Sequence, residues 1–148
     1  MLVAPCASQV GSVQIAARAL ETGLAKLMEL GYDLKNIESG WGICPLPPVA
    51  SDNLIALGRS NDAILYGSTV LYNLCDDDLS LASLVKQIPS SSYREYGRLF
   101  LEVYNGNFYE LDPFMFSPAE IWFCNSKSGR SFHAGVLRPD LLSNSFEL

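Results

Sequence analysis

A long amphipathic segment near the start of the chain constrains the fold more than any other feature. Between Ser8 and Leu30, apolar residues recur at the three- and four-residue spacing of a helix. The stripe that they form consists of Val13, Ala17, Leu20, Leu24, Leu27 and Met28. We therefore predict one helix over 8–30, capped by Ser8 or Ser12 and ended by Gly31. Such a helix has to bury its stripe against another layer of structure.

Short apolar runs bounded by turn residues supply that layer. The predicted strands cover 2–4, 34–38, 63–74 with a break at Gly67, 120–124 and 131–134. Further helices are predicted over 52–57, 76–88, 96–104 and 139–142, and residues 126–129 have the composition of a hairpin turn. Helices and strands alternate, which indicates an α/β fold, a layered sheet-and-helix domain that covers residues 1–148.

Three connecting segments have unusual compositions. Residues 39–48 combine glycines with prolines, which cannot donate hydrogen bonds to a sheet, so we predict a fixed loop. Residues 57–67 read LGRSNDAILYG, which we interpret as a polar turn followed by a short buried strand, Ala63–Tyr66. The aromatic-rich stretch 93–116 is interpreted as core, with a subunit interface as the alternative.

Composition excludes several classes of function. The formal net charge is −6 and the basic residues are scattered, which disfavours a nucleic-acid partner. No apolar run approaches the roughly 20 residues that a membrane span needs, and the start lacks the basic region of a signal peptide. The four cysteines stand far apart and there is one histidine, so we expect free thiols in a reducing cytoplasm and no metal site.

The strongest candidate site lies on the predicted N-terminal helix. Gln14, Arg18 and Glu21 are spaced four and three residues apart, so they share one face beside the apolar stripe. An ordinary surface ion pair, worth about a few tenths of a kcal/mol, is one interpretation. The neighbouring alanines favour another, because small residues around a charged pair let a ligand approach closely.

Other arrangements are less informative. One interpretation of the glycine-proline loop is a pocket wall in which Trp41 stacks on a planar ligand. The other interpretation is a rigid surface connection. Glu120 either faces a cleft or begins a strand. A serine–histidine–acid triad would require His133, which lies in a predicted hairpin without a nucleophile-elbow motif.

Several strings of residues are specific when taken together and in order: residues 57–67, GSVQI at 11–15 with Ala17, Arg18 and Glu21, PLPPVA at 45–50, PSS at 89–91, YG at 96–97, DP at 112–113 and FSPAE at 116–120. Through these strings the chain resembles the methenyltetrahydromethanopterin cyclohydrolases over nearly its whole length. The members of that family are considerably longer, and this chain corresponds to their C-terminal portion. The resemblance therefore implies the C-terminal half of a two-domain cyclohydrolase.

The resemblance implies reversible hydrolysis of a methenyl bridge to an N-formyl group on a tetrahydromethanopterin derivative, in one-carbon metabolism. It implies no metal and no redox cofactor, and it assigns catalysis to Glu21 with Arg18 beside it. A single carboxylate can take a proton from water and later return it to the departing nitrogen. The candidate substrate-binding residues are Gln14, Asn61 and Asp62, with anchoring of the following strand as the alternative for Asn61 and Asp62.

The same resemblance leaves alternatives of other classes. The chain is either an enzyme or a truncated, non-catalytic domain for pterin binding, complementation or oligomerisation. A plain structural domain, with Arg18 and Glu21 as surface residues, is a third interpretation. The resemblance also implies a cytoplasmic homo-oligomer, with a separate N-terminal half as an additional candidate partner.

Overall fold

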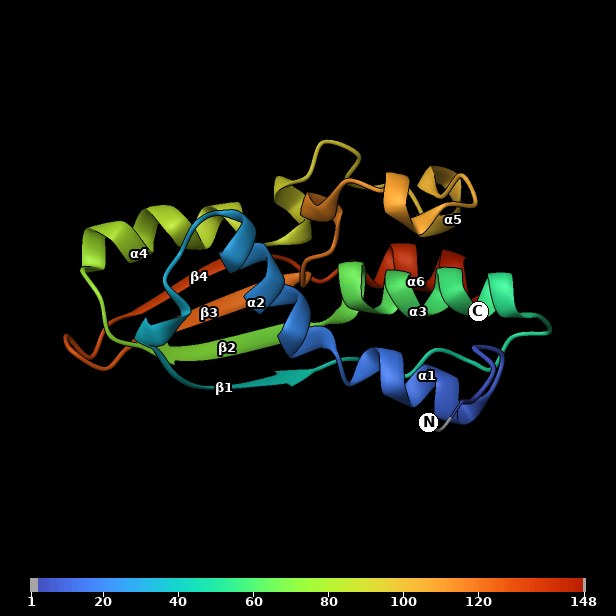
Figure 1. Cartoon of the computed structure of the whole chain (residues 1–148), viewed down its shortest axis with the longest axis horizontal. Coiled ribbons are helices and arrows are strands. Elements are labelled where there is room, and N and C mark those ends of the chain that lie inside the picture. The colour runs from blue at the N-terminus through green and yellow to red at the C-terminus, as the bar shows by residue number, and fades with distance from the viewer. Residues whose placement is uncertain (1–2, 148) are drawn as a thin grey trace.

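The computed structural model describes residues 3–147, and these form a layered α/β structure around one four-stranded sheet (Figure 1). The strands are β1 (Ile37–Ile43), β2 (Thr69–Leu74), β3 (Glu120–Asn125) and β4 (Ser131–Gly135). The helices are α1 (Gln9–Ala16), α2 (Ala19–Glu29), α3 (Asn53–Gly67), α4 (Asp78–Leu84), α5 (Phe100–Val103) and α6 (Pro139–Phe146). The predicted α/β class is confirmed.

The sheet has the order β1-β2-β3-β4 and is mixed. The central strands β2 and β3 run parallel, while β1 and β4 pair antiparallel at the two edges. Residues 75–119 make the crossover between the parallel strands, as such a connection requires. Within residues 3–147, no helix is long and apolar enough to cross a membrane.

The predicted single helix over 8–30 is wrong, because the structure divides it into α1 and α2. Ser8 caps α1, as predicted, by accepting a hydrogen bond from the backbone N–H of Gly11. The chain turns at Ala17 and Arg18, and Gly31 follows α2 with a φ of 77°. The two helices have different supports: α1 contacts α3, whereas α2 packs on β1 and β2.

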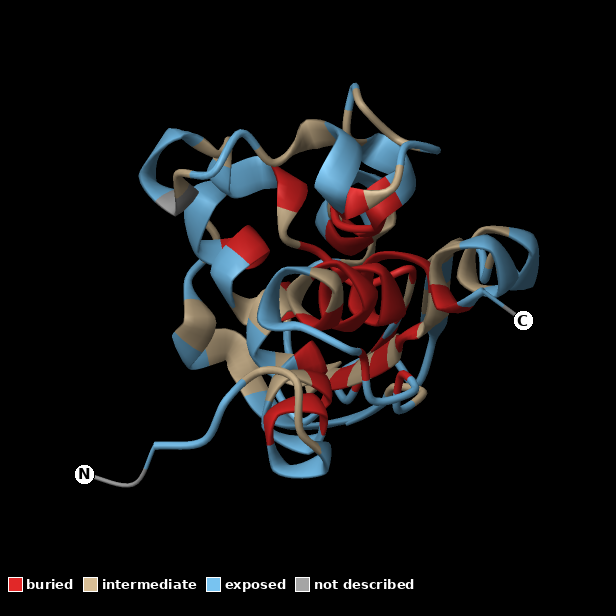
Figure 2. Cartoon of the chain, turned by 90° about the vertical axis from the view of Figure 1, so that its right-hand side faces the viewer, coloured by how far each residue is buried: buried red, intermediate tan, exposed pale blue. Residues whose placement is uncertain are grey.

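The predicted strand Ala63–Tyr66 is also wrong, because the whole segment 57–67 belongs to α3. The Asp52 carboxylate caps this helix by accepting hydrogen bonds from the N–H groups of Leu54 and Ile55. Every residue from Gly58 to Tyr66 is buried (Figure 2). A helix that is enclosed on all sides has no polar face, so its sequence lacks the stripe that would distinguish it from a strand.

Other boundaries differ less. Residues 34–36 form a helical turn, so the predicted strand 34–38 begins at Ile37 and continues through Ile43, inside the predicted loop 39–48. The predicted helix over 96–104 is reduced to α5. The predicted helix over 76–88 corresponds to α4, which ends at Leu84 and is followed by a 3₁₀ turn. The predicted helix over 139–142 corresponds to α6, which continues to Phe146. The C-terminal hairpin is confirmed. Val3 and Ala4 have no regular structure, and the rest of predicted strand 2–4 lies outside the described residues.

The main core lies between one face of the sheet and the helices α2 and α4 (Figure 1). It contains Leu27 from α2, Tyr72 from β2, Leu81 from α4 and Phe123 from β3, all of them almost fully buried. A second core surrounds α3 and joins Leu65 and Tyr66 to Phe100 and Met115. The interpretation of 93–116 as a source of core residues is therefore confirmed for these last two side chains.

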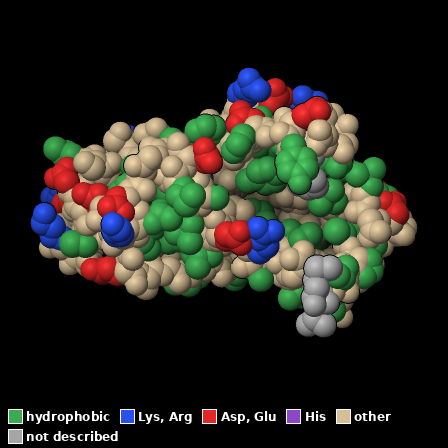
Figure 3. Space-filling model, viewed as in Figure 1, with side chains coloured by type: hydrophobic (Ala, Val, Ile, Leu, Met, Phe, Trp, Pro, Cys, Tyr) green, Lys and Arg blue, Asp and Glu red, His purple; other side chains and the backbone are tan. Residues whose placement is uncertain are grey.

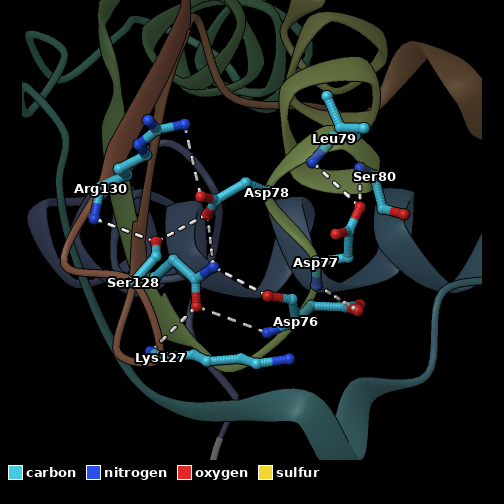
Figure 4. Close-up of polar contacts among 9 residues, drawn as sticks. Asp76, Asp77, Asp78, Leu79, Ser80, Lys127, Ser128 and Arg130 are labelled. Atoms are coloured by element: carbon cyan, nitrogen blue, oxygen red, sulfur yellow. Dashed lines mark hydrogen bonds and ion pairs between the residues drawn. The ribbon is translucent and has the colours of Figure 1, made fainter.

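The start of α4 is fastened to the β3–β4 hairpin (Figure 4). Asp77 caps the helix, and the side-chain amide of Asn125 donates to the Asp76 carbonyl at 2.8 Å and the Asp78 carboxylate at 2.7 Å. Ser128 donates to the same carboxylate at 2.6 Å, and Arg130 lies 3.6 Å from it. These contacts give the acidic run at 76–78 a structural role in the fold.

Two glycines with positive φ provide a test of the hairpin. Gly129 (φ 74°) has open space where a Cβ would stand, whereas a Cβ on Gly135 (φ 90°) would overlap the carbonyl oxygen of Ala119. We expect Gly129→Ala to cost about 1–2 kcal/mol of unfolding free energy from the left-handed backbone alone. Gly135→Ala should cost about 3 kcal/mol or more, because steric overlap adds to that strain. Urea denaturation measures both, and equal losses would contradict this account.

Candidate functional site

A cavity of about 480 Å³ lies where α1, α2 and α3 meet the segment that leads into β3. Its apolar wall includes Ile15, Leu57, Ile64 and Phe116. Polar side chains from three helices also line it: Gln14 from α1, Arg18 and Glu21 at the start of α2, Thr22 and Asn61. The space-filling view shows a hollow lined largely by hydrophobic side chains on this side of the molecule (Figure 3). Its volume and mixed lining are typical of small-molecule sites.

Arg18 and Glu21 form a two-point ion pair on the cavity wall. The Arg18 Nε donates to Glu21 Oε2 at 2.9 Å, and the second guanidinium nitrogen donates to Oε1 at 2.6 Å. This parallel arrangement fixes the orientation of the carboxylate. Both side chains are 58% exposed, so the pair is accessible to a ligand and to water.

The local fold places this pair. Arg18 is the N-cap residue of α2, and Glu21 lies in the first turn, where the free N–H groups of the helix favour a negative charge. The hydrogen bond from Arg18 lowers the pKa of Glu21 below its ordinary value, against a smaller opposing effect of desolvation. Glu21 is therefore ionised at neutral pH and able to accept a proton.

Gln14 and Asn61 approach the same cavity from α1 and α3. The Asn61 side chain is largely buried, and its Nδ2 donates to the carbonyl of Leu57 one turn earlier at 2.9 Å. Four of the five predicted site residues therefore lie around one cavity: Gln14, Arg18, Glu21 and Asn61. Sequence spacing placed Gln14, Arg18 and Glu21 on one face of a single helix, but Gln14 lies on α1 and the other two at the start of α2. Asn61 joins them from α3, in a segment that we predicted to be a polar turn.

Asp62 does not line this cavity. Its carboxylate accepts hydrogen bonds from the backbone N–H of Phe100 at 2.8 Å and from the hydroxyl of Ser145 at 2.6 Å, so it joins α3 to α5 and α6. Arg59 makes a parallel connection, from its guanidinium to Glu147 and to the carbonyl of Ser145. The alternative that we kept for Asp62 was anchoring of a following strand, but the segment is helical and these contacts hold α3 to α5 and α6 instead.

The weaker candidates also lie elsewhere. Trp41 is on β1, 52% exposed and outside the cavity. Glu120 begins β3, where it accepts a hydrogen bond from Thr69 at 2.8 Å and contacts the His133 ring at 2.7 Å. His133 stacks on Trp122 and has no serine nucleophile among these contacts. Among the described residues there is no cluster of three or more histidine, cysteine or acidic side chains suited to a metal ion.

Sequence reasoning missed two polar members of the cavity wall, Thr22 and Cys6. Thr22 was recognisable, because it follows Arg18 by four residues and so shares its face of α2. Cys6 comes from the irregular segment before α1, where no periodicity predicts the direction of a side chain.

The assembled site can bind a flat organic cation and move a proton. The apolar wall suits an aromatic ring system, and the Glu21 carboxylate stabilises positive charge close to it. The same carboxylate can serve as a general base towards water, since it is ionised and exposed.

Comparisons with known proteins agree with one family throughout the chain. The family described as Cyclohydrolase (MCH) matches residues 1–146. The methenyltetrahydromethanopterin cyclohydrolase of Methylobacillus flagellatus is 43% identical over 98% of this chain and 45% of its own length. Those of Methanocella arvoryzae and Methanococcoides burtonii are 41% and 39% identical, over 98% and 97% of this chain and 46% of their own lengths. The chain thus spans a little less than half the length of these relatives.

The buried Asp62 carboxyl predicts a distinctive pH dependence of stability. Burial raises its pKa from 3.8 to about 6, although the bonds from Ser145 and Phe100 act in the opposite direction. The folded state binds the Asp62 proton more tightly than the unfolded state does. The protonated carboxyl therefore contributes its full stabilisation below pH 3.8, and this stabilisation is lost as the pH rises through about 6.

Asp62→Asn should therefore stabilise the protein at pH 7 by on the order of 2 kcal/mol and remove the fall in stability between about pH 4 and 6. The asparagine keeps the acceptor for the N–H of Phe100. Denaturation at a series of pH values tests this, with Asp52→Asn at the exposed cap of α3 as the matched control. Identical pH profiles for wild type and Asp62→Asn would contradict the assignment.

Proposed function

This chain belongs to the Cyclohydrolase (MCH) family, and we propose that it takes part in the reversible hydrolysis of methenyltetrahydromethanopterin to its N-formyl form. The observation that carries the proposal is the Arg18–Glu21 pair, which lies on the wall of a cavity large enough for a small molecule. The names of the relatives supply the substrate and the reaction.

The reaction requires water to attack the carbon that bridges two nitrogens of a cationic amidine. Glu21 takes a proton from that water as the new C–O bond forms, which yields a neutral tetrahedral adduct. Glu21 then returns the proton to the departing nitrogen as its bond to carbon breaks, leaving the N-formyl group on the other nitrogen. Loss of a proton to solvent balances the positive charge of the substrate, and no redox step occurs.

Arg18 supports this cycle in two ways. Its two-point contact engages both carboxylate oxygens and holds them in one orientation, so that their remaining lone pairs are presented to water in a fixed direction. It also keeps Glu21 ionised to more acidic pH, which favours binding of a cationic substrate. Gln14 and Asn61 contribute polar groups for the edge of the pterin, and Phe116 contributes an aromatic surface.

A second candidate function follows from the length of this chain relative to its relatives. Because the chain spans under half of its relatives, the alternative is that it acts only with a separate polypeptide that resembles their remaining part. The 58% exposure of Arg18 and Glu21 favours such a partner, since closing the site would exclude water from the reacting groups. We further propose a cytoplasmic homo-oligomer that needs neither metal nor redox cofactor.

Glu21→Gln should remove most of the turnover, about a hundredfold or more, because the amide cannot accept the proton from water. Loss of methenyl absorbance measures the rate. Glu29→Gln is the matched control, since Glu29 is exposed near the other end of α2 and outside the cavity. Equal activity of the two variants would overturn the role of Glu21.

The same assay separates the two candidate functions. One arm uses the chain alone, and the other adds the remaining part of the Methylobacillus flagellatus relative as a separate polypeptide. Turnover by the chain alone identifies an autonomous enzyme, whereas turnover only in the second arm identifies a complementing half. Absence of turnover in both arms, with folded protein, would refute the enzymatic proposal.

The ion pair also predicts the titration of Glu21. Arg18 lowers the pKa of this carboxyl below 4.5, so its ionised form should persist to more acidic pH than an ordinary glutamate. In Arg18→Met the lowering hydrogen bond is lost, and the pKa of Glu21 should rise. Carbon-13 NMR of the side-chain carboxyl measures this directly, and the acid limb of the pH–rate profile should move to higher pH with it. An unchanged titration would show that the pair does not control the protonation of Glu21.

A further inference from the structure

Lys26 is the one lysine of α2, and it is buried to 3% exposure although nothing in the proposed reaction uses it. Its ammonium group donates a hydrogen bond to the backbone carbonyl of Phe114 at 2.5 Å and lies 4.8 Å from the centre of the Phe114 ring. Desolvation lowers its pKa, while the nearby carboxylate of Asp112 acts in the opposite direction. Burying an ammonium group costs free energy, so the presence of a buried lysine at this position requires an explanation.

The carbonyl that Lys26 holds belongs to a short turn that directly precedes Phe116 of the cavity wall. Residues Pro113–Met115 form a 3₁₀ turn, which Asp112 caps by accepting a hydrogen bond from the N–H of Phe114. Met115 is buried in the second core, and the next residue, Phe116, forms part of the cavity wall. The position of this turn therefore decides how far Phe116 stands from α2.

Lys26 connects that turn to the helix that presents the proposed base. It follows Thr22 by four residues, one turn farther along α2, and Thr22 adjoins Glu21 on the cavity wall. A methionine would fill the same space, so packing alone does not require an ammonium group here. What lysine adds is a charged hydrogen bond to a main-chain atom, combined with contact to an aromatic face.

We propose that Lys26 is a positioning residue, which sets the gap between the Glu21 side of the cavity and the aromatic wall at Phe116 by holding the carbonyl of Phe114. The ligand held in this gap is the flat pterin ring of the proposed function, on which this inference rests. Lys26 touches neither the ligand nor the reacting atoms. Its effect is on ligand affinity, because Phe116 contacts the ring equally in the ground state and the transition state.

The first test compares Lys26→Met with Lys86→Met, a control at an exposed surface lysine. Both variants are first shown by circular dichroism to be folded at the assay temperature. Titration with methenyltetrahydromethanopterin should give a Kd about tenfold higher for Lys26→Met, a loss of about 1.4 kcal/mol. The KM should rise with little change in kcat, as expected for loss of uniform binding. Lys26→Arg, which keeps a cationic donor, should recover part of the affinity.

A double-mutant cycle with Phe116→Leu tests whether the effect passes through the aromatic wall. If Lys26 acts by placing Phe116, the double variant should bind the pterin no more weakly than the weaker of the two single variants. Additive losses, about a hundredfold in total, would show that the two residues act independently and would overturn the proposal. An unchanged Kd in Lys26→Met would overturn it as well.

The design distinguishes failure of this inference from failure of the proposed function. Binding by the wild type, alone or with the remaining part of a relative, combined with an unaffected Lys26→Met variant, refutes only the positioning role. Absence of pterin binding by the wild type in both arms refutes the proposed function, and the positioning role with it.

Discussion

The packing of α2 on the sheet is the contact on which the rest of the structure depends. Tyr72 of β2 stands at its centre, 1% exposed, and its hydroxyl donates to the carbonyl of Leu20. Gly23 of α2 and Gly40 of β1 flank this ring so closely that a Cβ on either would overlap it. A large aromatic side chain on the strand and two residues without side chains thus bring helix and sheet together, and they fix the position of α2 across β1 and β2.

Because one face of α2 packs on the sheet, the directions in which its remaining side chains point are also fixed. Arg18 and Glu21 at its start adjoin the cavity, and Lys26 one turn beyond Thr22 reaches the turn before Phe116. The break at Ala17 and Arg18 lets α1 follow α3 while α2 follows the sheet. A straight helix over 8–30 would satisfy only one of these two surfaces. The same break makes Arg18 a cap residue and brings Glu21 to the N-terminal turn of α2, where its negative charge is favoured.

Sequence patterns predicted the elements that have one buried side and one exposed side. The strands β3 and β4 and their turn were predicted closely, because alternation and glycine-containing turns are local signals. The start of α3 matches the predicted helix over 52–57, but its second half was misjudged. Residues 58–66 are all buried, and the polar ones are held by distant partners: Arg59 by Glu147, and Asp62 by Ser145 and Phe100. Residues 39–43 of β1 were read as a loop because glycines often mark turns, whereas here the glycine at position 40 allows the close approach of Tyr72.

The sequence by itself determined the α/β class, the family and the Arg18–Glu21 pair, because these depend on local spacing and on strings of residues in order. Only the tertiary structure decided that Asn61 joins this pair at a cavity whereas its neighbour Asp62 serves the packing of α6. Adjacent residues on a helix point about 100° apart, and which direction meets a cavity depends on the elements packed around it. The link from Lys26 to Phe114 spans 88 positions in the chain, so it too exists only once the helix and the turn are packed together.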